Sequence, residues 1–138
     1  MERAGRWGML AAALWAVNAN AADWPQWRGP HRDGKSVETI APWTEPPRTL
    51  WEQPIGEAHS SPVVVAGRVF CMEKVGTDEI VRALDVQTGK ELWKHQYHAP
   101  FSNVYGNGPR ATPTVAEGKV YTLGARGDLR CLEAESGK

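Results

Sequence analysis

From Leu50 onward the chain alternates short apolar runs with turn residues. The runs are four to six residues long and rich in β-branched and aromatic side chains, and Gly, Asp, Asn and Pro separate them. This spacing predicts antiparallel strands joined by hairpins. The expected strands cover residues 62–65, 69–73, 80–85 and 91–96 in a first set, and 112–116, 119–123 and 129–133 in a second.

These strands are not simply apolar on one face and polar on the other. Residues 63–65 and 69–72 are apolar at consecutive positions, so we expect their sheet to be buried on both faces. A small sheet is covered twice when similar sheets stack against it, as the blades of a radial array do. A β-sandwich of unrelated strands is the alternative, but it does not explain the repeat described next.

Two segments of the chain recur further along it. Ser61–Phe70 aligns with Thr112–Tyr121 at a shift of 51 residues, and Ala83–Lys90 aligns with Cys131–Lys138 at a shift of 48. A period in this range indicates a repeat architecture. We therefore expect about two four-stranded blades, the second incomplete. Because a propeller needs roughly 4–8 blades, we also expect this chain to be a fragment that packs against the remaining blades of a longer protein.

The recurring segment has residues suited to a hairpin turn and to packing between blades. The Asp85 carboxylate can accept hydrogen bonds from backbone N–H groups of the turn, and Thr88 can do so more weakly. Gly89 can adopt a positive φ. Ala83 is small and leaves room for a large neighbour, and a buried tryptophan covers about 150–250 Å². We therefore expect Trp93 to pack at a junction between blades.

The pattern Ala-x-Asp-x-x-Thr-Gly-x-x-x-Trp resembles the tryptophan-docking motif of PQQ-like (quinoprotein-like) β-propeller repeats. All five of its specified positions are matched, by Ala83, Asp85, Thr88, Gly89 and Trp93. A second, partial motif consists of Cys131, Glu133, Ser136 and Gly137. The resemblance implies an all-β fold of antiparallel four-stranded blades.

Two further segments are similar to this repeat group. Leu50-Trp51 matches Leu92-Trp93 and is interpreted as the end of an earlier motif. The segment Trp24–Pro30 is similar to the start of exported bacterial proteins with these repeats. The expected organisation is a signal peptide at 1–21, a Pro- and Gly-rich extension at 22–49 and propeller repeats at 50–138.

The resemblance implies one of two functions. Quinoprotein dehydrogenases bind pyrroloquinoline quinone (PQQ) and calcium on the propeller axis, commonly with a vicinal cysteine pair, whereas BamB-like propellers are non-catalytic scaffolds. No adjacent cysteines occur here, and no acidic residue can be matched to a calcium or catalytic position. The favoured interpretation is a non-catalytic module without a cofactor that binds a protein partner or small ligand in the cell envelope. The alternative is a fragment of a PQQ- and calcium-dependent alcohol or sugar dehydrogenase.

The first 21 residues have the pattern of a secretory signal, with Arg3 and Arg6 before the apolar run Trp7–Val17 and a small-x-small site at Ala19–Ala21. Eleven apolar residues are too few for a membrane span, which needs roughly 20; an uncleaved anchor helix is the alternative. No lipid-acceptor cysteine follows, so we expect a periplasmic or extracellular protein. Basic and acidic residues balance at 16 each, which gives no indication of nucleic-acid binding.

The remaining candidate residues have structural and functional interpretations. Cys71 and Cys131 are expected to be buried free thiols in strands, with a disulfide as the alternative. His95 and His98 are expected to be solvated residues at the loop 96–110, on opposite faces of an extended chain, with a metal site as the alternative. Arg110 is expected to make a structural contact, with anion binding as the alternative. We therefore assign no metal, catalytic or cofactor-binding residue.

Overall fold

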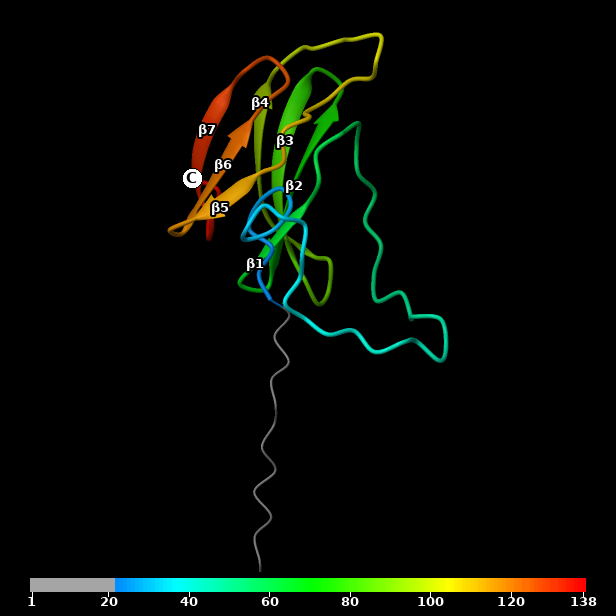
Figure 1. Ribbon diagram of the computed structural model, residues 1–138. Coiled ribbons are helices and arrows are strands. Elements are labelled where there is room, and N and C mark those ends of the chain that lie inside the picture. Colours follow the sequence, from blue (N-terminus) through cyan, green and yellow to red (C-terminus); the bar gives the residue numbers. More distant parts are fainter. Residues whose placement is uncertain (1–21) are drawn as a thin grey trace, which may run out of the picture.

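The computed structural model describes residues 22–138 and consists of two antiparallel sheets (Figure 1). The expected signal segment, residues 1–21, lies outside the described residues. Within residues 22–138, no helix has the length and apolar character that crossing a membrane requires. The all-β fold class predicted from the sequence is confirmed, with a four-stranded antiparallel sheet followed by a three-stranded one.

The first sheet has four strands in the order β1-β2-β3-β4. They are β1 (Val63–Val65), β2 (Arg68–Val75), β3 (Asp78–Asp85) and β4 (Glu91–His98). Short hairpins connect β1 to β2 and β2 to β3, and a longer turn that carries Gly89 connects β3 to β4. The strands match those expected from the sequence to within a few residues, and β2 and β4 each continue two residues further than the apolar runs indicate.

The second sheet has three strands in the order β5-β6-β7. They are β5 (Thr114–Ala116), β6 (Lys119–Leu123) and β7 (Leu129–Glu133). Its first hairpin repeats that of the first sheet, because Ala116 pairs with Lys119 as Val65 pairs with Arg68. The sequence repeat is therefore a repeat of structure as well.

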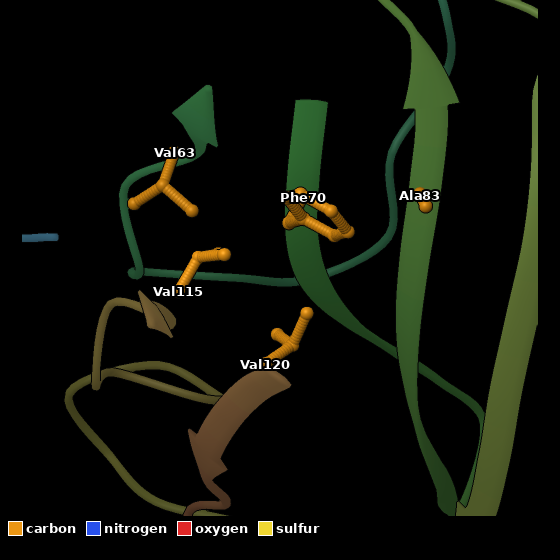
Figure 2. Packing of buried hydrophobic residues seen from close by; sticks show 5 residues of the cluster. All are labelled: Val63, Phe70, Ala83, Val115 and Val120. Atoms are coloured by element: carbon orange, nitrogen blue, oxygen red, sulfur yellow. The ribbon is translucent and has the colours of Figure 1, made fainter. Parts of the chain in front are cut away.

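The two sheets stand side by side and come closest at β1 and β5 (Figure 1). Between them lies an apolar cluster in which Val63, Phe70 and Ala83 of the first sheet face Val115 and Val120 of the second (Figure 2). A second cluster consists of Met72, Val81, Tyr97, Ala99 and Leu132. Burying apolar area of this kind contributes about 25 cal/mol per Å², so the contact between the sheets stabilises both of them.

The first sheet is covered on both faces, as its continuous apolar runs predict. Four consecutive residues of β2, Phe70 to Glu73, are buried. Met72 packs toward the second sheet. On the opposite face, Glu73 accepts a hydrogen bond from the backbone N–H of Gly56, at 2.5 Å. The segment around Trp51–Glu57 therefore covers this face.

The extension, residues 22–49, forms no helix and no strand beyond one isolated bridge. In that bridge Trp24 donates its N–H to the carbonyl of Val64 at 2.7 Å and accepts the N–H of Val64 at 3.1 Å. The carbonyl of the next residue, Pro25, accepts the N–H of Val115 at 2.8 Å. Residues 24–25 thus join β1 and β5, whereas residues 35–50 are exposed and loop away from the sheets (Figure 1).

Two expectations about single residues were wrong. His98 lies on β4 and not in the loop, because β4 extends to His98 opposite Asp78, whereas His95 lies within the strand expected at residues 91–96. Cys131 lies on β7 as expected, but its side chain is exposed, because it is on the face of this sheet that points away from the first sheet.

Candidate functional site

Trp93 of β4 packs on the turn that follows β7 in the second sheet. Its indole N–H donates to the carbonyl of Ala134 at 3.0 Å. Its ring lies on Gly137, where an added Cβ would stand 2.6 Å from the nearest ring atom. The ring also lies 5.9 Å from that of Phe70, centroid to centroid. Trp93 therefore connects the outermost strand of one sheet to a turn of the next.

Trp51 makes the same contact one repeat earlier. Its indole N–H donates to the carbonyl of Val86 at 2.9 Å, and its ring lies 2.6 Å from the position that a Cβ on Gly89 would occupy. In the sequence repeat, Val86 corresponds to Ala134 and Gly89 to Gly137. The interaction therefore occurs twice. In each case an indole N–H donates to a backbone carbonyl of the turn and the ring lies on the glycine of that turn.

Asp85 organises the turn that receives Trp51. One oxygen of its carboxylate accepts the N–H groups of Gln87 at 3.1 Å and Thr88 at 2.8 Å, together with the Thr88 hydroxyl at 2.8 Å. Gly89 has a φ of 69° and donates its N–H to the carbonyl of Asp85. The hydroxyl of Thr88, followed by its N–H, holds the pKa of Asp85 below its ordinary value. Ala83 is fully buried in β3, opposite Trp93.

The second turn keeps the backbone geometry but not the side-chain bonds. Gly137 has a φ of 72° and donates its N–H to the carbonyl of Glu133, and Ser136 does the same at 3.3 Å. The Glu133 carboxylate instead forms an ion pair with Lys119 across the β6–β7 ladder. Cys131 lies in register with Tyr121 and does not contribute to the turn. The turn therefore depends on the glycine more than on the acidic residue.

Two buried carboxylates, which the sequence analysis did not single out, join the first sheet to its neighbours. Glu73 bonds to Gly56, as described above, and forms an ion pair with Arg82 at 2.6 Å. Glu79 accepts the Tyr97 hydroxyl at 2.6 Å and the N–H of Ala125 at 2.9 Å. The sequence offers only a weak signal for them, because the strands that carry Glu73 and Glu79 also contain other charged residues.

Tyr97 lies between a carboxylate and a cation. The Arg130 guanidinium lies 3.8 Å from the centroid of the Tyr97 ring. Burial, followed by the hydrogen bond to Glu79, raises the pKa of Tyr97 well above its ordinary value. Gly124 is close by, and a Cβ there would stand 2.3 Å from the Glu79 carboxylate. These groups form a polar contact between the two sheets and not a reactive site open to solvent.

The other candidate residues make local contacts. Arg110 donates to the carbonyls of Gly106 at 2.7 Å and Gly108 at 3.0 Å, and it stacks on the Phe101 ring. His98 lies 3.1 Å from the Asp78 carboxylate, and the His95 ring lies 6.1 Å from that of Tyr97. Among residues 22–138, no three His, Cys, Asp or Glu residues come together in a way that could hold a metal ion.

The described residues do not fit the quinone site that the dehydrogenase resemblance implies. Cys71 and Cys131 are both free and lie on different sheets, so they offer no cysteine pair on which a quinone could stack. At the strand edges where the sheets converge, Trp24 already pairs with Val64, and Pro25 already accepts the N–H of Val115.

A groove of about 700 Å³ lies between the two sheets, at the end that carries the β1–β2 and β5–β6 turns. The side chains at its base come from the apolar cluster, including Phe70 and Val115. Its outer residues include Glu117 and Glu135, which are exposed. The groove cannot be predicted from the sequence of one repeat, because it forms only where the two repeats meet.

Comparison with known proteins places the chain in a family. The family of repeats described as outer membrane protein assembly factor BamB matches residues 37–138. This range includes both sheets and both docked tryptophans, Trp51 and Trp93. No curated protein matches the chain. Because the match spans more than half of the sequence and coincides with the repeated fold, the chain belongs to this family of BamB-like PQQ repeat proteins.

Proposed function

We propose that this protein is an exported, non-catalytic propeller module that binds a protein partner in the cell envelope. The observation that carries the proposal is the main-chain pairing of Trp24 with Val64, continued by Pro25 and Val115. β1 and β5 are the strands at which the sheets converge, so in a radial array they face the axis. Residues 24–25 occupy those edges, which leaves the ends and outer faces of the blades for binding.

The rest of the structure supports a rigid binding scaffold. The first sheet is joined to the second by Trp93 and Glu79, and the segment 51–57 is joined to the first sheet through Trp51 and Glu73, so the connecting loops are presented on a fixed frame. Binding surfaces are commonly carried by loops on a rigid scaffold, and a frame ordered in advance reduces the entropic cost of binding. Export is supported by the pattern of residues 1–21.

The first test separates the scaffold from the dehydrogenase. The purified protein is titrated with PQQ and calcium while tryptophan fluorescence is followed, and it is then assayed for alcohol- and glucose-dependent reduction of a redox dye. We expect no saturable, calcium-dependent binding and no dye reduction. Turnover of either substrate would overturn the non-catalytic assignment.

The second test asks for the partner directly. A photo-crosslinking amino acid is placed at Trp27, Tyr105 or Glu135, one position in each derivative, and the cells that produce the protein are irradiated. All three side chains are exposed. We expect a discrete adduct with an envelope protein from one position and none from the others. Absence of any adduct when the protein is correctly exported would contradict a binding role for these surfaces.

A further inference from the structure

We infer that the groove between the two sheets binds a cationic segment of a partner protein, one in which lysine or arginine alternates with aliphatic residues. The inference rests on the proposed binding function and names the surface and the chemistry of the partner. The groove has a volume of about 700 Å³, within the range of roughly 300–1,000 Å³ that is usual for ligand sites.

The walls of the groove come from four parts of the chain. The β1–β2 hairpin contributes Val65 and Ala66, the β5–β6 hairpin contributes residues 116–118, and the turn after β7 contributes residues 133–135. The fourth wall is the N-terminal segment, with Asp23 and Pro25. The Asp23 carboxylate accepts the N–H of Ala66 at 2.9 Å, so this wall is attached to the first sheet by a side-chain bond as well as by the Trp24 bridge.

The base of the groove is apolar. Phe70 and Val115 are buried there, and Val65 and Ala134 are half-buried beside them. A partly exposed apolar base of this kind favours an aliphatic side chain, because burying its surface removes it from water. A small hydrophilic ion would gain nothing from these contacts.

The rim of the groove is acidic, although the whole chain is neutral. Four carboxylates line it, those of Asp23, Glu117, Glu133 and Glu135, against one guanidinium, that of Arg68. Asp23 and Glu133 have partners in Ala66 and Lys119. Within residues 22–138, Glu117 and Glu135 make no hydrogen bond or ion pair, so their charges are available to a ligand.

The fold does not require these two acidic residues. Glu117 corresponds to Ala66 in the first hairpin, and the two residues have nearly the same φ, 50° and 49°. Glu135 corresponds to Gln87 in the first docking turn. The first repeat therefore forms the same turns with a neutral residue at each position. The acidic side chains are added specifically where the groove lies.

An apolar base and an acidic rim together define the ligand. Lysine and arginine carry an aliphatic stem and a cationic head, and neighbouring leucine or valine side chains can reach the base. A nucleic acid is excluded by repulsion between its phosphates and the rim carboxylates. A metal ion is disfavoured because no cluster of three ligands occurs among residues 22–138.

The inference is tested with three fluorescein-labelled peptides of equal length. The first alternates lysine with leucine and valine, the second has glutamate at every lysine, and the third has serine at every leucine and valine. Binding to the purified protein is followed by fluorescence anisotropy at low and high ionic strength. We expect the first peptide to bind most tightly, and more weakly at high salt because salt screens exposed charges. Equal binding of the first two peptides, or no binding of the first, would overturn the inference.

A pair of double variants tests the location. Glu117→Ala with Glu135→Gln should weaken binding of the cationic peptide about tenfold, which corresponds to about 1.4 kcal/mol, because two favourable exposed charge pairs are lost. Glu45→Gln with Glu52→Gln makes the same change in net charge at exposed positions away from the groove and should change the affinity less than about twofold. Equal weakening by both pairs would show that only overall charge matters and would refute the site.

These outcomes remain distinct from those of the proposed function. An adduct at Trp27 or Tyr105 combined with no peptide binding would retain the binding module and remove the groove as its site. Circular dichroism of both double variants checks that the sheets are intact.

Discussion

The indole ring of Trp93 lies on the backbone of Gly137, so close that a Cβ on this glycine would stand 2.6 Å from the ring. Trp51 lies on Gly89 at the same distance. In both cases the indole N–H reaches the carbonyl three residues before the glycine, at Ala134 or Val86. Each tryptophan can therefore pack in this way only when the neighbouring turn has a glycine. The close approach of the ring to the turn depends on this glycine.

The variant Gly89→Ala should destabilise the protein by about 2–5 kcal/mol. The substitution forces a side chain into a positive φ, which costs about 1–2 kcal/mol, and it overpacks the contact with Trp51, which costs about 1–3 kcal/mol. Urea unfolding followed by circular dichroism measures the change.

Gly76→Ala is the matched control for this variant. Gly76 has a similar φ of 60°, but a Cβ there would meet nothing within 4 Å. We expect this variant to lose only the conformational cost of about 1–2 kcal/mol. If both variants are destabilised equally, packing of Trp51 does not contribute to the effect of the first.

Stability should fall at acid pH through Asp85. Its pKa in the folded protein is lowered, chiefly by the Thr88 hydroxyl and then by the Thr88 N–H. The stabilisation is therefore fully present above the ordinary value of about 3.9, and it is lost as the pH falls through the lower folded-state value. Asp85→Asn keeps an oxygen acceptor but cannot titrate, so its urea midpoint should decline less between about pH 5 and pH 2.

Thr88→Val gives a second measurement of the same group. Without the hydroxyl, the Asp85 carboxylate loses the largest of the contacts that lower its pKa. The acid decline that Asp85 causes should then be smaller and should end at a higher pH than in the unaltered protein, because the folded-state pKa lies closer to the ordinary value. An NMR titration of the Asp85 carboxyl carbon would contradict this prediction if its midpoint is the same in both proteins.

The contact between Glu79 and Tyr97 should contribute measurably to stability. Both side chains are buried, and the Tyr97 hydroxyl donates to the carboxylate at 2.6 Å. Tyr97→Phe should cost about 1.5–3 kcal/mol, because a hydrogen bond to a charged group is lost inside the protein. Tyr105→Phe is the control, since Tyr105 is 86% exposed, and it should change the free energy of unfolding by less than about 0.5 kcal/mol. Equal effects of the two variants would show that the hydrogen bond from Tyr97 to Glu79 does not contribute to stability.

The strands and the docking motif could be predicted because their signals are local. Apolar runs and turn residues determine β1 to β7 to within a few residues, and the five residues from Ala83 to Trp93 indicate both the turn and the packing role of the tryptophan. The ends of β2 and β4 could not be placed in this way. They continue through polar residues such as Lys74 and His98, which are held by pairing with β3 and not by their own preference.

The contacts between repeats could not be predicted from one repeat alone. The hydrogen bond from Ala125 to Glu79 and the bridge from Trp24 to Val64 join residues far apart in the sequence. Cys131 is a second example of this difficulty. It occupies an apolar strand, yet it is exposed because its face of the second sheet has no neighbour among the described residues.

The two cysteines should differ sharply in reactivity. Cys71 is buried, and burial raises the pKa of its thiol to about 11, so roughly one molecule in a thousand carries the reactive thiolate at pH 8. Cys131 is exposed. Mass spectrometry after treatment with N-ethylmaleimide should therefore find one label on the folded protein, on Cys131, and two after unfolding in guanidinium chloride. Cys131→Ser should remove the label from the folded protein and leave that of Cys71 after unfolding. If neither cysteine is labelled until a reductant is added, the two are joined by a disulfide, and the positions of β2 and β7 relative to each other must differ from those described.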